Sequence, residues 1–354
     1  MLGIFWYGWN KEQTYCETSV NSNTYVSVII AFRNEAENLP QLLSSLNSQS
    51  YPKNKFEILL INDHSTDNSV QIIETLHDLT ESTRIIHLPD IETGKKAAVI
   101  KGVSEARGEL LLFTDADCIL PQNWIKLHSD FYNKHHKPSL IIGMVSYLIG
   151  NGYSDYFLEL ELQSLVASAF GAAGINHPIM CNGANLAVKS SVYKNINIKN
   201  HLASGDDMFL LSEIKKNDRN KISMIKDPGC IVKTKPVNNI PAFFNQRIRW
   251  ASKSRHYNDR DIIISGLVVF LINTGLLYSM VLSVVYLNIL PFSLVFGLKT
   301  LTDILFLNQH LKFIGQRNLL CYLPLFQFIY PLYAVFFGFL GLFIPFNWKG
   351  RLYK

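Results

Sequence analysis

The feature that most constrains the fold is a long stretch near the C-terminus that carries no charge. No Asp, Glu, Lys or Arg occurs between Asp261 and Lys299, and only seven occur from residue 262 to the end. A run of about 20 apolar residues is long enough for a helix to span a bilayer. The C-terminal region therefore predicts two to three membrane segments, near 262–287, 292–310 and 319–344.

Basic residues precede the first of these segments, namely Arg247, Arg249, Lys253, Arg255 and Arg260. By the positive-inside rule, this places the preceding domain in the cytoplasm. Three full crossings would put the final "NWKGRLYK" on the far side, which the same rule disfavours, so one segment could be re-entrant or interfacial. We expect a multi-pass protein of the cell membrane with a cytoplasmic domain.

Composition narrows the remaining classes of protein. The net charge of +5 is too small to indicate a nucleic-acid partner. Five scattered cysteines without a C-x-x-C pair favour free thiols over a disulfide framework or a zinc site. The first 24 residues have no basic region and too short an apolar run for a signal peptide. Through its aromatic residues this segment could lie on a membrane surface, or it could be loosely packed.

The middle of the chain alternates between two kinds of pattern. Apolar β-branched runs cover 25–32, 56–63, 83–88 and 109–117, and helical patterns cover 34–49, 65–79 and 93–107. Strands that alternate with helices predict βαβ units and a parallel sheet buried on both faces. Beyond them we expect a strand at 139–148, a long helix at 154–174 and a basic, aromatic helix at 240–261. The predicted α/β domain covers residues 25–260, between the N-terminal segment 1–24 and a membrane region 261–354.

Carboxylates stand at the ends of these elements. Asp63 ends the second predicted strand, Asp115 and Asp117 end the fourth, and Asp206 and Asp207 begin a helix. Residues i and i+2 of an extended chain point to the same side, so Asp115 and Asp117 could face one Mg²⁺ or Mn²⁺ ion. One of the paired acids at 206–207 could act as a general base. The simpler interpretation of Asp63 is an Asx turn, and that of the Asp115–Asp117 pair is a polar surface turn. The pair at 206–207 could simply be acids that favour a helix N-terminus.

The fourth feature is "QRIRW" at 246–250, just ahead of the membrane region. Arg and Trp are common at membrane interfaces, which is one interpretation. In the other, Arg249 binds phosphate through its fork of donors and Trp250 offers a flat face to a sugar or lipid acceptor.

The order of these motifs resembles a known family. "ND" at 62–63, "DAD" at 115–117, "GDD" at 205–207 and "QRIRW" look like the D, DxD, D, QxxRW signature of family 2 inverting glycosyltransferases, which have the GT-A nucleotide-sugar-binding fold. "VSVIIAFRNEAENL", "GKKAAVIKG" and "CNGANLAVKSSVY" resemble further segments of that family, over about residues 25–260. Two positions depart from its pattern: His64 stands where Gly is usual, and Asp206 where Glu is frequent.

The resemblance implies roles for individual residues. Asp63 would hold the nucleotide base, and Asp115 and Asp117 would bind the metal and the diphosphate, with Asp117 the more direct ligand. Asp207 would be the catalytic base. Weaker candidates for nucleotide contacts are Glu35 and Lys95, with Lys96 competing for the role of Lys95. The diphosphate and acceptor side would be lined by Gln246, Arg249, Trp250 and Asp206.

The activity implied is transfer of a sugar from a nucleotide-sugar, with UDP the nucleotide favoured by the resemblance, to a lipid or glycan acceptor at the membrane. The cofactor would be Mg²⁺ or Mn²⁺. The final "WKGRLY" resembles the ending of members that modify lipids, as in glycolipid biosynthesis of the cell envelope. Two alternatives remain: a processive polysaccharide synthase, which the short membrane region disfavours, and a non-catalytic membrane scaffold, which the intact acids disfavour.

Overall fold

The computed structural model describes residues 1–15, 23–75, 82–150, 152–196, 206–237, 239–341, 343–348 and 351–353, without the side chains of 206, 256, 346–348 and 351–353. Contacts divide the chain into two compact units. The sheet unit comprises Lys11–Leu148 and Met180–Lys235, and the helical unit comprises Met1–Asn10, Ile149–Ile179 and Pro236–Lys354. This division is not sequential, because the N-terminal helix, the long helix near 160 and the "QRIRW" helix group with the C-terminal helices.

The sheet unit contains a seven-stranded sheet in the order β3-β2-β1-β4-β8-β6-β9. Neighbours among β1–β4 are parallel, β8 is antiparallel to both β4 and β6, and β6 is parallel to β9. The mainly parallel α/β prediction is thereby confirmed. The strands are β1 Val26–Phe32, β2 Phe56–Asn62, β3 Thr83–His87, β4 Leu110–Phe113, β6 Leu140–Ile142, β8 Leu186–Lys189 and β9 Ile222–Met224.

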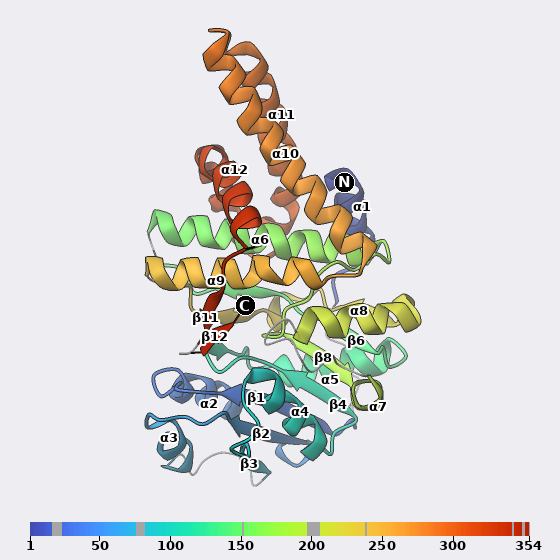
Figure 1. Ribbon diagram of the computed structural model, residues 1–354. Coiled ribbons are helices and arrows are strands. Elements are labelled where there is room, and N and C mark those ends of the chain that lie inside the picture. The colour runs from blue at the N-terminus through green and yellow to red at the C-terminus, as the bar shows by residue number, and fades with distance from the viewer. Residues whose placement is uncertain are drawn as a thin grey trace. The chain divides into compact units, whose positions relative to one another are not determined.

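Helices cover this sheet because its central strands are apolar on both faces; every residue of β2 is buried (Figure 1). Helix α4 approaches β1 and β2 closely at Gly102, where a Cβ would lie 2.6 Å from Ile29 and 2.8 Å from Ile61. The helices are α2 Leu39–Asn47, α3 Ser69–Thr75, α4 Lys95–Glu105, α5 Trp124–Lys134, α7 Ser190–Asn195 and α8 Asp206–Asp218, with short 3-10 turns at Lys53–Lys55, Arg219–Lys221 and Pro228–Cys230.

The single strand expected at 139–148 is wrong, because two strands in different sheets occupy this segment. β6 ends at Ile142 in the large sheet, and β7 (Val145–Tyr147) joins β5 (Cys118–Ile119) and β10 (Val232–Thr234) in a small sheet. The buried side chain of Asn185 lies at the break. Its amide Nδ2 donates to the Met144 carbonyl at 2.7 Å, and its atoms occupy the space where a Cβ on Gly143 would stand.

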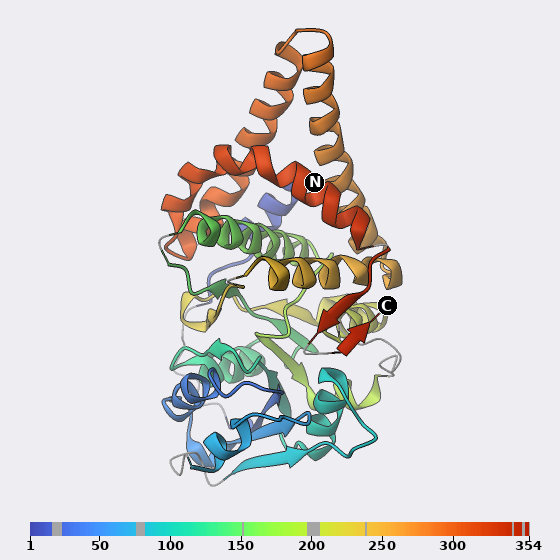
Figure 2. The ribbon, with the colours of Figure 1, turned by 60° about the vertical axis from the view of Figure 1, so that its left-hand side comes forward.

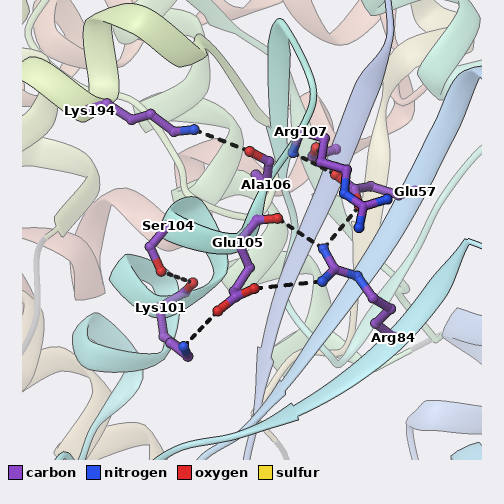
Figure 3. Close-up of polar contacts among 9 residues, drawn as sticks. Glu57, Arg84, Lys101, Ser104, Glu105, Ala106, Arg107 and Lys194 are labelled. Atoms are coloured by element: carbon purple, nitrogen blue, oxygen red, sulfur yellow. Dashed lines mark hydrogen bonds and ion pairs between the residues drawn. The ribbon is translucent and has the colours of Figure 1, made fainter.

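A buried carboxylate ties together the amino edge of the sheet, opposite the ends where the acids of the motifs lie. Glu57, near the start of β2, accepts a hydrogen bond from the Ser27 hydroxyl at 2.6 Å and from the Arg107 backbone at 2.7 Å. Arg84 bridges Glu57 and the end of α4, where Glu105 also pairs with Lys101 (Figure 3). This network stabilises the scaffold away from the candidate site.

The helical unit contains the apolar segments predicted from the sequence. Each of Arg260–Val285, Leu290–Phe313 and Arg317–Leu340 is long and apolar enough to cross a membrane. Figure 2 shows α10 and α11 joined by a short turn, from which the two helices diverge. The elements are α1 Leu2–Lys11, α6 Tyr153–Gly174, α9 Ile240–Ser252, α10 Arg260–Val285, α11 Leu290–Phe313, α12 Leu323–Leu340 and the strands β11 Phe346–Trp348 and β12 Arg351–Tyr353, with 3-10 turns at Lys253–His256 and Arg317–Tyr322.

The continuous helix expected over 240–261 is wrong. Helix α9 ends at Ser252, one 3-10 turn follows, and α10 begins at Arg260. Asp259 caps the new helix, since its side chain accepts from the backbone N–H groups of Asp261 at 2.9 Å and Ile262 at 3.3 Å. An N-cap of this kind satisfies the donors that a helix start leaves unpaired.

Helix α1 packs against α6 through glycine. A Cβ on Gly171 would collide with the Phe5 backbone, and a Cβ on Gly8 would collide with the Gly171 carbonyl. On the same helix Trp9 is buried, with its ring 6.0 Å from that of Phe170, whereas Trp6 is 42% exposed. Helix α1 therefore packs one face against α6 and exposes Trp6 and Tyr7.

Candidate active site

The register of the sheet brings the ends of several strands to one edge. Phe32 pairs with Asn62, and Asn62 pairs with His87, so β1, β2 and β3 end level with one another. β4 is parallel to β1 and points to this edge, with its last residue Phe113 opposite Ile29, and β8, which runs antiparallel to β4, begins opposite Phe113. The residues after β2 and β4 and those before β8 therefore meet at the carboxyl edge, where open α/β sheets bind ligands.

Asp63 lies at this edge and is 2% exposed. Its Oδ1 atom accepts a hydrogen bond from the Gly94 backbone N–H at 3.1 Å and lies 4.0 Å from the Arg33 guanidinium. Gly94 has a φ of +99°, which other residues rarely adopt, so glycine is needed to direct this N–H. The contact explains why a Gly stands before the helix that begins "KKAAVIKG".

His64 occupies the position where the family pattern has Gly. Its φ is +56°, in the left-handed region that glycine adopts without steric cost. The ring Nδ1 lies 3.2 Å from Asp63 Oδ1, so the imidazole adds a third contact to the same carboxylate oxygen. The preference for Gly thus has a backbone cause, and the His side chain adds a polar group beside Asp63.

The "DAD" motif lies in a turn and not at the end of a strand. β4 ends at Phe113, and the Cys118 N–H donates to the Asp115 carbonyl at 3.2 Å to close the turn. The expectation that Asp115 and Asp117 share a side because of strand alternation is therefore wrong. Lys95, in the first turn of α4, forms an ion pair with Asp115, whereas the neighbouring Lys96 is buried.

The pKa of Asp117 is shifted by the charged residues around it. Burial and the nearby carboxylates of Asp115 and Glu35 raise the pKa of Asp117 to about 6, and Lys95 opposes the shift. A concentration of carboxylate oxygens fits a hard divalent cation, which prefers oxygen ligands. Within the part of the chain that the structure describes, no three His, Cys, Asp or Glu side chains are grouped so as to hold a metal by themselves.

Asp207 lies in the first turn of α8 and contacts the segment that precedes β8. Its carboxylate accepts from the Gly183 N–H at 3.2 Å and from the Met208 N–H at 2.9 Å, and its carbonyl accepts from the Cys181 thiol at 3.2 Å. Because this segment returns to the carboxyl edge, Asp207 is tied to the same edge as the acids. The neighbouring Asp206 begins α8, but its side chain lies outside the described part.

Asn185 holds the segment in front of β8. Its Oδ1 accepts from Trp124 Nε1 at 2.9 Å and lies 2.9 Å from His128 Nε2, and its Nδ2 donates to the carbonyls of Met144 and Cys230. The side chain is fully buried and each amide atom has partners. The sequence reasoning did not single out Asn185, although it lies in the quoted "CNGAN" segment.

Helix α9 carries the "QRIRW" motif and belongs to the helical unit. Gln246, Arg249 and Trp250 are partly buried there, whereas Arg247 is 2% exposed and forms an ion pair with Glu161 of α6. The structure thus groups Glu35, Asp63, Lys95, Asp115, Asp117 and Asp207 in one unit, and Gln246, Arg249 and Trp250 in the other. Arg33 was not among the predicted site residues, although a basic residue directly after a strand was an available signal, and Arg247 was noted only for its charge ahead of the membrane region.

Residues 27–165 match the sequence model of glycosyl transferase family 2. This match runs from β1 into α6, so it includes the part of the sheet unit that carries Asp63, Asp115 and Asp117. The resemblance drawn from the motifs is confirmed at the level of the domain.

Individual relatives agree with this assignment. Glycosyltransferase AglE of Haloferax volcanii is 28% identical over 190 residues, covering 52% of this chain and 59% of that protein. An undecaprenyl-phosphate 4-deoxy-4-formamido-L-arabinose transferase of Proteus mirabilis is 33% identical over 93 residues, covering 26% of this chain and 28% of that protein. The chain thus spans less than two thirds of the length of these relatives. A poly(ribitol-phosphate) β-N-acetylglucosaminyltransferase of Staphylococcus aureus is 30% identical over 118 residues, covering 33% of this chain and 20% of that protein.

A solved structure shares the fold. The mannosyltransferase PcManGT of Pyrobaculum calidifontis, in complex with GDP-mannose and Mn²⁺, has a TM-score of 0.51 at 19% identity, covering 71% of this chain and 68% of that one. At this identity the likeness concerns the fold. It agrees with the GT-A prediction.

Proposed function

We propose that this protein is a membrane-anchored inverting glycosyltransferase. It moves a sugar from a nucleotide-sugar, a UDP-sugar by family resemblance, to a hydroxyl of a lipid or membrane-associated acceptor. The observation that carries the proposal is the meeting of Asp63, the Asp115–Asp117 turn and the segment that contacts Asp207 at one edge of the sheet. Three helices long and apolar enough to cross a membrane support an acceptor located there.

The donor side is assigned to the first strands of the sheet. Asp63 contacts the nucleotide base, with Glu35 and Lys95 as further nucleotide contacts. Asp117 and Asp115 hold Mg²⁺ or Mn²⁺, which when bound would neutralise negative charge on the diphosphate. Such ions are commonly held by one or two carboxylates together with substrate phosphates, and the crowded carboxylates around Asp117 support this arrangement.

Asp207 acts as the base. It takes the proton of the acceptor hydroxyl while the hydroxyl oxygen bonds to the anomeric carbon and the bond from that carbon to the diphosphate oxygen breaks. A single displacement inverts the configuration at that carbon, so no carboxylate nucleophile is needed. Gln246, Arg249, Trp250 and Asp206 line the diphosphate and acceptor side. The basic residues ahead of α10 favour a cytoplasmic location for this chemistry.

The test is a transfer assay on membranes that contain the protein. Labelled UDP-glucose, UDP-galactose, UDP-N-acetylglucosamine and GDP-mannose are supplied with Mn²⁺ to the wild type and to Asp117→Ala, and the product is partitioned between organic solvent and water. Label in the organic phase, absent in the variant, supports the proposal and names the donor. Label in large water-phase material supports a polysaccharide synthase instead, and intact UDP binding without transfer from any donor supports a scaffold.

A further inference from the structure

The second residue of the "QRIRW" motif, Arg247, lies at the centre of a buried polar cluster in the helical unit. Its side chain is 2% exposed, and that of its ion-pair partner Glu161 is 6% exposed. Glu161 also accepts a hydrogen bond from the Tyr333 hydroxyl of α12. One carboxylate of α6 therefore joins α9 to α12, the last of the apolar helices.

Arg247 also contacts two of the residues to which we assign a role in binding. Its Nη1 donates to Gln246 Oε1 at 2.6 Å, and its guanidinium lies 4.4 Å from the centre of the Trp250 ring. The guanidinium also lies 4.8 Å from the centre of the Phe243 ring, four residues earlier on the same helix. Cation–π contacts of this kind strengthen when they are desolvated, as they are here.

The packing around this cluster restricts α9 further. Ile248 of α9 and Phe337 of α12 are both buried in one apolar cluster, against which Phe243 and Tyr333 pack. A guanidinium is planar and presents several donors in a fixed fork, so it can orient Gln246 and Glu161 at the same time. A lysine would supply charge without that geometry.

We propose that Arg247 is a positioning residue of the transferase. It fixes the side chains of Gln246 and Trp250 by tying α9 to Glu161 of α6 and, through Glu161, to Tyr333 of the membrane helix α12. This inference rests on the proposed function, in which Gln246 and Trp250 line the diphosphate and acceptor side. It assigns a role in that site to Arg247, to Glu161 and to one membrane helix.

The test compares Arg247→Met, Arg247→Lys and the double variant Glu161→Gln/Arg247→Met with the wild type, in the full-length protein. Arg247→Met alone leaves a buried carboxylate without its cation, which destabilises the fold. The double variant removes both charges, so we expect it to stay folded. Arg219→Met, at an exposed arginine of the sheet unit, is the matched control.

Three measurements are made on each variant: thermal unfolding in detergent, UDP affinity by calorimetry, and kcat and acceptor KM in the transfer assay. We expect the folded double variant to bind UDP as the wild type does but to lose about 100-fold in kcat/KM for the acceptor, the effect of misplacing a binding group by about 1 Å. We expect Arg247→Lys to lose less of this kcat/KM than the double variant does, and Arg219→Met to lose none.

The positioning role is overturned if the folded double variant transfers as well as the wild type, or if the loss in every variant matches its unfolded fraction. These failures differ from failure of the proposed function. A wild-type protein that transfers no sugar from any donor overturns the proposed function, whereas wild-type transfer that survives in the double variant overturns the positioning role alone.

Discussion

Asp207 is held by two backbone N–H groups, of Gly183 and Met208, and an asparagine in its place can still accept one of these bonds. Asp207→Asn should therefore fold but lack the base. We predict that kcat falls by at least about 100-fold, the usual contribution of a general base, while UDP affinity is unchanged. Steady-state kinetics and calorimetry check this, with Glu213→Gln on the same helix as the control. Transfer at the wild-type rate would show that the base is another group.

His128 makes the sheet unit sensitive to acid. Burial lowers the pKa of this imidazole from 6.5 to about 4, with the hydrogen bond to Asn185 opposing the shift. The unfolded chain then binds a proton below about pH 6.5 that the folded chain takes up only near pH 4. The contribution of neutral His128 to the free energy of unfolding is therefore complete above pH 6.5. It decreases as the pH falls towards 4, by about 3 kcal/mol in all.

We predict that the melting temperature of His128→Gln falls less steeply than that of the wild type between pH 6.5 and 4.5, because the glutamine does not titrate. Scanning fluorimetry in detergent over this range is the measurement. His136→Asn is the matched control, since His136 is exposed and has a left-handed φ of +58° that asparagine tolerates. Parallel curves for His128→Gln and the wild type would show that His128 is not the group responsible.

The contact between α1 and α6 depends on glycines that allow the two backbones to approach. We predict that Gly171→Ala destabilises the helical unit by about 1–3 kcal/mol, because the added Cβ collides with the Phe5 backbone and forces α1 away. Gly266→Ala on α10 is the control, since no atom lies within 4 Å of the added Cβ. Thermal unfolding and protease cleavage near residue 11 are the measurements, and equal behaviour of the two variants would contradict the prediction.

The elements were predicted unequally. The strands at 25–32 and 56–63 and the helix at 93–107 were predicted well, since runs of Val, Ile and Leu and an Ala-containing helical pattern are local signals. Strand β8 and the small sheet were not predicted. Strands of two to four residues carry little pattern of their own, and their pairing with β4 and β7 comes from contacts distant in sequence.

The grouping of α6 and α9 with the C-terminal helices makes a truncation informative. A chain that ends at residue 259, close to the domain boundary expected from the sequence, loses Tyr333, Phe337 and Leu307, which cover α6 and α9. Glu161 and Arg247 would keep each other but lose their apolar cover. We predict that this chain aggregates, as measured by size-exclusion chromatography without detergent. A soluble monomer with a cooperative melting transition would contradict the prediction.

The candidate site was predictable in its residue types but not in its geometry. Asp63, Asp115, Asp117 and Asp207 were chosen from their positions beside predicted elements, and the structure ties all four to one edge of the sheet. Asp115 and Asp117 do not lie on an extended strand as predicted, because β4 ends two residues before Asp115. The contacts of Asp63 with Gly94 and of Lys95 with Asp115 were not predictable, since they join residues that are 31 and 20 positions apart in the chain.

The sequence by itself determined the α/β class, the apolar C-terminal segments and the acids of the motifs, because periodicity, hydropathy and charge are properties of neighbouring residues. Only the tertiary structure decided that the chain divides into two units, each made of separate stretches of the sequence, and that Arg247 lies buried against Glu161. A charged side chain gives no local sign that it will be buried, since its cost is offset by a partner that lies 86 residues away in the chain.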